Sequence, residues 1–189
     1  MKPTVEIKKG EKISKKLFDF MDKERINQYG KKTNLFNRKY HKKSNFFFVK
    51  NEKKIVGFGF LRPTEMRYKN KKYNLLALGG IMIISEEKGQ GYGTILIQNM
   101  IDYSKKNKKT ILGFCEKDLV DFYEKAGLKS KKEFSIRIEM EDPKTKERIL
   151  DADKCAGIYY EGKEGFVSKV IKSKGVATYW MPDIKNPHF

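Results

Sequence analysis

Cysteine, histidine and long apolar runs are scarce in this chain of 189 residues, and each shortage excludes a class of protein. The only two cysteines, Cys115 and Cys155, are too few for a disulfide framework, so a reducing, cytoplasmic setting is expected. The two histidines lie far apart without a cysteine cluster, which argues against a metal site. The longest apolar run, residues 75–84, is too short for a membrane span, and the first residues lack the apolar block of a secretion signal.

Acidic residues are also in short supply, because 42 Lys and Arg stand against 24 Asp and Glu, a formal net charge of +18. Residues 1–54 carry 17 basic and 6 acidic groups (+11), whereas residues 115–189 carry 15 and 14 (+1). A basic front half is able to bind nucleic acid through counterion release. The alternative is a lysine-biased composition that keeps the surface solvated. The scattered lysines and the lack of a groove-reading motif favour this alternative.

What the chain does have is a regular supply of apolar and aromatic residues, including 13 Phe and 10 Tyr, which argues against disorder. Its length fits one domain with an adequate core. Residues 13–26 place Ile13, Leu17, Phe20 and Met21 near helical spacing. Residues 45–50 and 54–61 predict one hairpin, and residues 65–69 and 73–84 predict a second with its turn at 70–72.

The second half of the chain alternates helical and extended patterns. Residues 94–107 and 118–128 predict helices, the second beginning at Asp118 and ending at Gly127, while residues 110–115 and 134–140 predict strands. Beyond residue 150, glycines interrupt aromatic runs such as 165–171 and 175–181, which we predict to be additional strands or a cover. The order of elements indicates a mixed α/β layer architecture, in which the apolar run 73–84 is central.

The string KGQGYGT, Lys88 to Thr94, lies between the predicted central strand and a predicted helix. Its alternate glycines permit a sharp turn, and the amides at the start of the helix form an anion site suited to phosphate. The spacing matches neither a P-loop nor the dinucleotide fingerprint Gly-x-Gly-x-x-Gly. Taken alone, a tight turn without a ligand remains an equal alternative.

At this point the sequence resembles the GNAT superfamily of N-acetyltransferases. The string Lys88-Gly89-Gln90-Gly91-Tyr92-Gly93 is similar to the family's acyl-CoA motif, Arg/Gln-x-x-Gly-x-Gly/Ala, with lysine at its first position. The string FYEKAGL, Phe122 to Leu128, resembles the family's second signature. The resemblance covers about residues 40–140, and weaker similarity indicates the branch of aminoglycoside 2′-N-acetyltransferases and nodulation-type N-acyltransferases.

The resemblance implies an α/β (α+β mixed) fold. Its central sheet would be mixed but mostly antiparallel, with a splay between the two central strands and helices on both faces. We expect the GNAT domain to span residues 1–150. The extension, residues 151–189, carries no family motif, and we expect it to supply extra strands that pack on the same domain. Two pairs of aromatic residues in the extension, Tyr159 with Tyr160 and Tyr179 with Trp180, are candidates for an acceptor pocket or a dimer contact, although core packing is favoured.

The resemblance further implies acetyl-CoA, or another acyl-CoA, as cosubstrate. The backbone of Ile81, Met82 and Ile83 would pair with the pantetheine arm, and an N–H near Met82 would bind the oxyanion. Tyr123 would protonate the leaving thiolate, since a phenol and a thiol have comparable pKa values. The pyrophosphate would lie on the amides of the glycine turn, where Lys88 supplies a cation; the residues assigned to this role are Lys88, Gly89, Gln90, Gly91, Gly93 and Thr94.

Several alternatives to these roles stay open. Tyr123 also fits an ordinary core stripe on its helix. Cys115 is a candidate acyl-accepting nucleophile, although no histidine is near it in sequence. Glu65 and Glu116 are candidates for the general base, and for both a surface charge is the favoured interpretation. The locally acidic stretch 139–153 is more simply a solvated turn than a site for a cationic amine.

The sequence therefore predicts an enzyme that transfers an acetyl group to a primary amine of a small molecule or amino-sugar by direct attack. The competing hypotheses are a non-catalytic acyl-CoA-binding module and an acetyltransferase for a nucleic-acid-associated or protein substrate. Expected partners are acyl-CoA and the small amine, with a homodimer left open and neither a membrane nor a metal involved.

Overall fold

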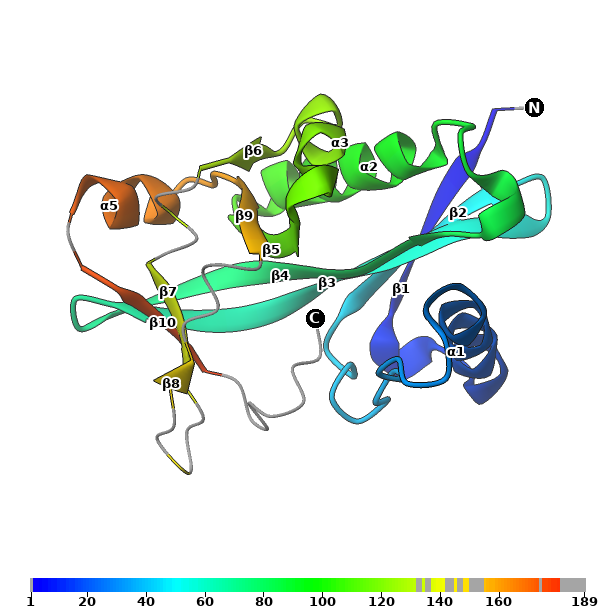
Figure 1. Cartoon of the computed structure of the whole chain (residues 1–189), viewed down its shortest axis with the longest axis horizontal. Helices are drawn as coiled ribbons and strands as arrows, with labels where there is room; N and C mark the ends of the chain where they lie inside the picture. Colours follow the sequence, from blue (N-terminus) through cyan, green and yellow to red (C-terminus); the bar gives the residue numbers. More distant parts are fainter. Residues whose placement is uncertain are drawn as a thin grey trace.

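The computed structural model of the chain describes residues 2–131, 134, 137–141, 145, 148–149, 155–173 and 175–180. Within these residues, ten strands and four α-helices alternate with short 3-10 turns (Figure 1). The strands are β1 (Thr4–Lys9), β2 (Asn45–Asn51), β3 (Lys54–Tyr68), β4 (Lys71–Ile83), β5 (Ile111–Glu116), β6 (Lys129–Ser130), β7 (Ile138–Glu141), β8 (Arg148–Ile149), β9 (Cys155–Tyr160) and β10 (Ala177–Trp180). The helices are α1 (Lys15–Tyr29), α2 (Tyr92–Asn107), α3 (Val120–Lys125) and α5 (Phe166–Lys172).

All ten strands belong to one mixed sheet, and most neighbours in it are antiparallel. Its main path runs β6-β9-β5-β4-β3-β10-β7-β8, and β4 with β5 and β7 with β10 are its parallel pairs. β2 pairs with β3 and carries β1 on its other edge. The predicted α/β fold with a central, mostly antiparallel sheet is therefore confirmed.

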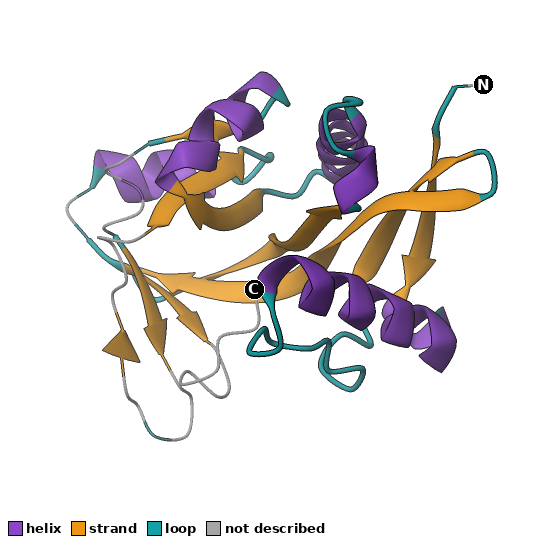
Figure 2. Cartoon of the chain, turned by 45° about the vertical axis from the view of Figure 1, so that its right-hand side comes forward, coloured by secondary structure: helices purple, strands orange, loops and turns teal. Residues whose placement is uncertain are grey.

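Helices cover both faces of the sheet, as expected. α1 lies on one face of the β3–β4 ribbon, and α2 with α3 lies on the other (Figures 1 and 2). The alternation of β2 explains this layering, because Phe46 and Phe48 pack with Phe18 of α1, whereas Phe47 and Val49 pack with the α2 cluster. Burial on both faces accounts for the continuous apolar sequence of this strand.

A third cluster lies beneath α5 at the far end of the β3–β4 ribbon. Phe166, Val167 and Val170 of α5 are completely buried and pack with residues of β3, β4 and β10. We predicted that residues 165–171 form a strand or a cover. The strand is wrong, because the segment forms the helix α5, which buries these three residues on one face. Glu161 accepts hydrogen bonds from the first-turn amides of Val167 (3.1 Å) and Ser168 (2.8 Å), which stabilises the helix start.

β3 is one strand of 15 residues, although the sequence predicted two strands separated by Pro63. The pairing explains how proline is accommodated. The β2 ladder ends at Leu61 and the β10 ladder begins at Met66, so Pro63 faces a gap on that edge. Towards β4, Pro63 lies opposite Leu76, whose amide points away from β3 and donates to the carbonyl of Thr110, just before β5, at 2.9 Å. No ladder hydrogen bond is therefore lost at Pro63.

Smaller differences concern the ends of the elements. β1, which the sequence analysis did not predict, pairs along its length with β2. The predicted strand 134–140 begins only at Ile138, and Phe134 is helical. The turn between β3 and β4 is Lys69-Asn70, both with positive φ (47° and 59°), as a two-residue hairpin turn requires. None of the helices in the described part of the chain is long and apolar enough to cross a bilayer.

Candidate active site

The central feature of the site is the divergence of β4 from β5. The two strands pair in parallel at only two positions, Leu76 with Ile111 and Ala77 with Leu112. Beyond these positions β4 continues to Ile83 beside β3, and β5 continues to Glu116 beside β9. The expected splay between the central strands is therefore present, and it leaves the β5-facing edge of β4 open for a ligand backbone.

A β-bulge changes which backbone groups of β4 face this opening. Phe60 pairs with Gly79 but Phe58 pairs with Met82, so β4 has one extra residue at Gly80–Ile81, and Gly80 has a φ of +60°. Before the bulge, the amide of Leu76 points towards β5. After it, the amide of Ile84 donates to Val56 of β3 at 3.0 Å.

By strand alternation, the amide of Met82 points towards β3, whereas the amides of Gly80, Ile81 and Ile83 point into the splay. The prediction of a donor near Met82 stays a prediction, and the alternation favours the neighbouring amides of Gly80 and Ile81 over that of Met82 itself. The backbone groups that face the opening belong to Gly80, Ile81 and Ile83, because Met82 lies in a hydrogen-bonded pair with Phe58. The carbonyl of Ile83 is within 3.3 Å of the Gln28 amide of α1, which agrees with this direction.

The glycine turn lies at the end of the splay and leads directly into α2. Gly89 and Gly91 have φ values of +81° and +78°, and a Cβ at either position would meet no atom within 4 Å. These two glycines are therefore required by the backbone and present an open main chain to the cavity. α2 begins at Tyr92, two residues before the predicted start, with Gly91 as its N-cap. Its first main-chain bond runs from Ile95 to Gly91, so the amides of Tyr92, Gly93 and Thr94 have no acceptor within the helix.

A cavity of about 500 Å³ lies between this turn, β4 and α3. It is lined by all the residues predicted to hold acyl-CoA except Gln90, and by Tyr123; the predicted ones are Ile81, Met82, Ile83, Lys88, Gly89, Gly91, Gly93 and Thr94. Gln90 is exposed and does not line the cavity. The structure thus brings together residues from β4, the turn and α3 that are up to 42 positions apart in sequence.

The charges around the turn suit a diphosphate group. Lys88 is exposed on the cavity wall, and its Nζ is 3.3 Å from the Gln28 side chain. Glu87 also lines the cavity, but its carboxylate is paired with Lys54 at 2.8 Å, which offsets its negative charge. The open glycines, the helix start and the lysine together fit the pyrophosphate of a coenzyme A molecule.

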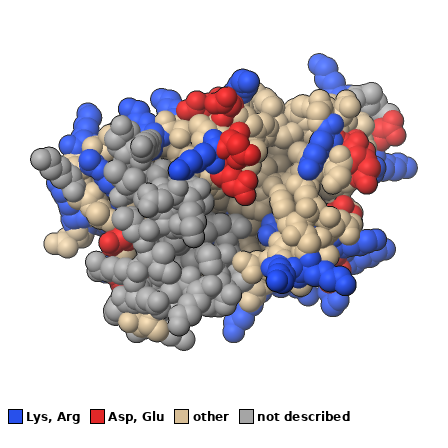
Figure 3. Space-filling model, viewed as in Figure 1, with Lys and Arg blue, Asp and Glu red and all other residues tan. Residues whose placement is uncertain are grey.

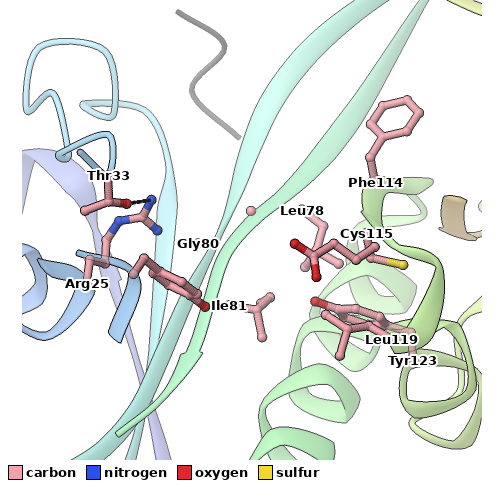
Figure 4. Close-up of a pocket in the computed structure, with 12 residues that line it drawn as sticks. Arg25, Thr33, Leu78, Gly80, Ile81, Phe114, Cys115, Leu119 and Tyr123 are labelled. Atoms are coloured by element: carbon pink, nitrogen blue, oxygen red, sulfur yellow. Dashed lines mark hydrogen bonds between the residues drawn. The ribbon is translucent and has the colours of Figure 1, made fainter. Parts of the chain in front are cut away.

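A second cavity, of about 370 Å³, shares lining residues with the first, and Figure 4 draws the residues that line it. Tyr123, Leu119 and Ile81 line both cavities, so these side chains form the boundary that the two cavities share. α1 and the segment after it supply Arg25, Tyr29 and Thr33, and β5 supplies Phe114, Cys115 and Glu116. Figure 4 shows Arg25 with Thr33 on one side of β4, and Cys115 with Tyr123 on the other.

Tyr123 is buried, with 8% of its surface exposed, and packs edge-on against Phe122 with ring centroids 5.0 Å apart. Desolvation raises the pKa of Tyr123 well above its ordinary value, and the nearby Cys115 and Tyr29 contribute in the same direction. The hydroxyl therefore remains protonated at physiological pH and is a proton donor. The same shift makes Tyr123 a weaker acid than a free phenol, so its pKa lies above that of a thiol and the two are not comparable as predicted.

The other candidate groups have distinct positions. Cys115 is buried (7% exposed) on the wall of the second cavity. Glu116 is exposed at the end of β5 and lines the same cavity. Glu65 lies in the middle of the β3–β4 ribbon, paired with Arg67 (3.6 Å) and Lys72 (3.2 Å), and is in neither cavity. Glu116 is therefore the better placed of the two predicted bases.

The sequence analysis missed the contribution of α1. It predicted the helix but assigned no function to its end, where Arg25, Gln28 and Tyr29 reach the site. The available signal was their spacing, since Arg25 and Tyr29 are four residues apart and share one helical face. What the sequence alone does not reveal is that β4 lies against that face. Within the described residues no three metal-ligating side chains come together.

Comparison with known proteins agrees with this geometry. The model of the acetyltransferase (GNAT) family matches residues 14–128, more than half of the chain. Similar solved structures include an acyl-CoA N-acyltransferase from Pseudomonas aeruginosa, with a TM-score of 0.57, 11% identity, and coverage of 84% of this chain and 99% of that one. The ElaA protein of Escherichia coli is similar with a TM-score of 0.56, 9% identity, and coverage of 85% and 100%.

A GNAT family acetyltransferase from Elizabethkingia anophelis, solved with acetyl-CoA bound, has a TM-score of 0.51, 14% identity, and coverage of 84% and 97%. No curated protein matches the sequence. At 9–14% identity the solved structures show a shared fold, whereas the family model matches the amino-acid sequence itself.

Proposed function

This chain belongs to the GNAT family of acetyltransferases and is an N-acetyltransferase that uses acyl-CoA, and we propose that its acceptor is a primary amine of a small molecule or amino-sugar. The observation that carries the proposal is that Tyr123 lies where two cavities meet and lines both of them. One cavity has the open main chain suited to a diphosphate, and the other has polar side chains and space for a compact acceptor.

We assign the binding of acyl-CoA to three parts of the first cavity. The amides at Gly89, Gly91, Gly93 and Thr94, with the cation of Lys88, hold the pyrophosphate. The main chain of Ile81 and Ile83 pairs with the pantetheine arm as a further strand would, because these groups face the splay. When bound, acyl-CoA supplies a thioester carbonyl as electrophile and a thiol as leaving group.

The backbone at the bulge provides the donors for the acyl carbonyl oxygen. Gly80 and Ile81 are consecutive, and both direct their amides into the splay because the bulge interrupts the alternation. Donors fixed by a strand need no reorganisation during the reaction, which is the condition for effective electrostatic stabilisation. The sequence predicted a donor near Met82, and we propose that the neighbouring Gly80 and Ile81 supply it.

Tyr123 donates its proton to the sulfur of the leaving group. Its hydroxyl is protonated throughout the physiological range, and it lies on the wall shared by both cavities. Glu116, in the second cavity, accepts the proton that the attacking amine loses, either directly or through water. The proton lost at nitrogen and the proton gained at sulfur thus balance within the site.

We propose direct attack by the amine, with no acyl-enzyme at Cys115. A nucleophilic thiol needs a base or a cation that lowers its pKa. Cys115 is buried beside Tyr123, and neither a histidine nor a lysine lines its cavity. The cation that does line this cavity, Arg25, donates its hydrogen bonds to Thr33 and Asn34 and lies on the other side of β4 from Cys115 (Figure 4). We therefore assign Cys115 a packing role.

The function is tested in two steps with purified protein. Calorimetry with coenzyme A should show binding, and acetyl-CoA with a panel of polyamines, aminoglycosides, amino acids and peptides should show amine-dependent thiol release. Binding without turnover on any amine would instead identify a non-catalytic acyl-CoA-binding module, and no binding would refute the proposal. Intact-mass measurement after incubation with acetyl-CoA alone should show unmodified protein, and an acetylated Cys115 would contradict direct attack.

A further inference from the structure

The second cavity, which we assign to the acceptor, contains a cation, Arg25, that has no role in the proposed transfer chemistry. Arg25 lies on α1, one turn before the helix ends at Tyr29, and its side chain lines the cavity (Figure 4). Nε donates to the Asn34 carbonyl at 3.2 Å, and Nη2 donates to the Thr33 hydroxyl at 3.5 Å. Both acceptors are neutral, so neither offsets the positive charge.

Arg25 has no direct ion pair with a carboxylate among the described residues, although the negative charge of Asp22 acts on it from one turn away. Among the residues that the structure describes, no carboxylate oxygen lies within 4.0 Å of its guanidinium. Asp22, one turn earlier on α1, instead accepts a hydrogen bond from the Phe36 amide at 2.8 Å. Burial lowers the pKa of Arg25 and raises the pKa of Asp22, so each ionised group is partly desolvated without a direct partner. A desolvated charge of this kind is costly unless a ligand pairs with it.

Ring contacts hold the guanidinium in place. Its carbon is 5.0 Å from the centroid of the Phe36 ring and 5.9 Å from that of Tyr29. These contacts and the two hydrogen bonds fix the side chain before any ligand arrives. A fixed, planar guanidinium favours a planar anion that accepts two parallel hydrogen bonds, and a carboxylate has that geometry.

The opposite wall of the cavity carries the opposite charge. Glu116 lines it from the end of β5, next to the cysteine of the same wall. The volume of about 370 Å³ corresponds to about twelve water molecules at ~30 Å³ each, which suits a compact molecule. An acceptor with an anionic and a cationic end matches these two walls.

We propose that the acceptor is a compact primary amine that also carries a carboxylate, bound by Arg25, with its amine towards Glu116 and Tyr123. This inference rests on the proposed function, because it names the substrate class of the same site. Arg25 is then a specificity-determining residue. The alternative is that Arg25 only fastens the segment 33–36 to α1.

The experiment compares paired acceptors that differ only in the carboxylate. A panel of α- and ω-amino acids is assayed for acetyl-CoA-dependent thiol release, each beside its carboxamide. We expect kcat/KM for the best acid to exceed that of its carboxamide by about 10-fold or more, since a hydrogen bond to a charged group contributes about 1.5–3 kcal/mol. In the Arg25→Gln variant that preference should disappear through a loss on the acid alone.

The control is Arg38→Gln, because Arg38 also donates to a neutral carbonyl, that of Ile13 at 3.4 Å, and stacks on a ring, that of Phe18, but does not line the cavity. This variant should keep the preference. An equal loss on acid and carboxamide in Arg25→Gln would assign Arg25 a structural role and overturn the inference. Acetylation of other amines, with acids and carboxamides equally poor, would also overturn it while leaving the proposed function intact. Absence of turnover on every amine would instead reject the proposed function.

Discussion

At the scale of single residues, Tyr123 shows how burial and chemistry are combined. The sequence left a catalytic role and a place in a core stripe as alternatives, and the structure shows features of both. The ring packs within the α2 cluster, whose members include Met100 and Leu128, while the residue lines both cavities. The two interpretations are therefore compatible, because the body of the ring packs in the core and the polar end is available to the site.

The Tyr123→Phe variant tests the catalytic role. It removes the proton donor but keeps the ring, so we expect kcat to fall by about 100-fold or more, with coenzyme A affinity and thermal stability nearly unchanged. The matched control is Tyr103→Phe, since Tyr103 of α2 packs edge-on against Phe47 at 5.6 Å and lines neither cavity. An unchanged kcat in Tyr123→Phe would show that the tyrosine only packs.

The pH profile of the wild type provides a second measurement of the same role. Because burial raises the pKa of Tyr123, its protonated, active form is retained throughout the neutral and mildly alkaline range. We therefore expect kcat/KM to rise with pH as the amine loses its proton and not to fall below about pH 10. A fall at lower pH that disappears in Tyr123→Phe would show that the tyrosine ionises there.

At the scale of elements, the glycine turn and the start of α2 are the best example of what sequence can reveal. Two glycines in the left-handed region and a helix immediately after them are local features, so spacing alone was sufficient to predict the turn and the helix that follows it. That this turn binds phosphate stays a prediction. The β4 bulge was not predictable in this way. It depends on the pairing of Gly79 and Met82 with β3, which is set by a strand some 20 residues earlier in the chain.

The same distinction explains α5. Residues 165–171 are rich in β-branched and aromatic residues, which favours a strand by composition. The helix forms because Phe166, Val167 and Val170 find an apolar surface on β3, β4 and β10, and because Glu161 caps the first turn. Both influences come from residues outside the segment, so tertiary packing overrode the local preference.

Gly91→Ala tests the turn as an element. An alanine would be strained at φ +78°, at a cost of about 1–2 kcal/mol, and its methyl group would enter the space assigned to the diphosphate. We expect coenzyme A affinity measured by calorimetry to fall by about 10-fold or more. Gly165→Ala is the control, because Gly165 is also a left-handed N-cap (φ +61°) with no atom within 4 Å of an added Cβ.

The control variant should lose a similar amount of thermal stability while keeping its coenzyme A affinity. If Gly91→Ala loses stability but binds coenzyme A as the wild type does, the turn does not hold the diphosphate.

At the scale of the whole molecule, we propose that residues 1–150 and residues 151–189 fold together as a single unit. The later residues supply β9, which pairs with all six residues of β5. They also supply α5 and β10, which complete the cluster beneath the far end of the β3–β4 ribbon. One of the two strands that border the splay, β5, is therefore paired along its outer edge with β9, which belongs to residues 151–189.

A chain truncated after residue 150 tests this unity. Without β9, the outer edge of β5 would be unpaired, and buried residues such as Ile111 and Leu112 would lose their neighbours. We expect the shortened chain to aggregate or to lack a cooperative thermal transition, and to lose coenzyme A binding. A truncated protein that unfolds cooperatively and binds coenzyme A as the full chain does would establish residues 1–150 as an independent domain.

The distribution of charged side chains over the surface is also a property of the whole molecule. On the described part of the face shown in Figure 3, basic side chains are dispersed and interleaved with acidic ones rather than gathered in one stripe. This distribution supports the interpretation that the excess lysine keeps the surface solvated.

The bulge in β4 has a consequence for sequence variation. Before it, the even-numbered Leu76 and Leu78 face α2; after it, the odd-numbered Ile81 and Ile83 face the same helix, and Met82 faces α1. The alternation of side chains between the two faces of β4 is therefore shifted by one residue at the bulge. Deleting the extra residue of the bulge would restore a regular alternation. The side chains between the bulge and the glycine turn would then exchange the faces of the sheet on which they lie. Homologous chains that retain this pocket should therefore differ here by substitution and not by a change in length.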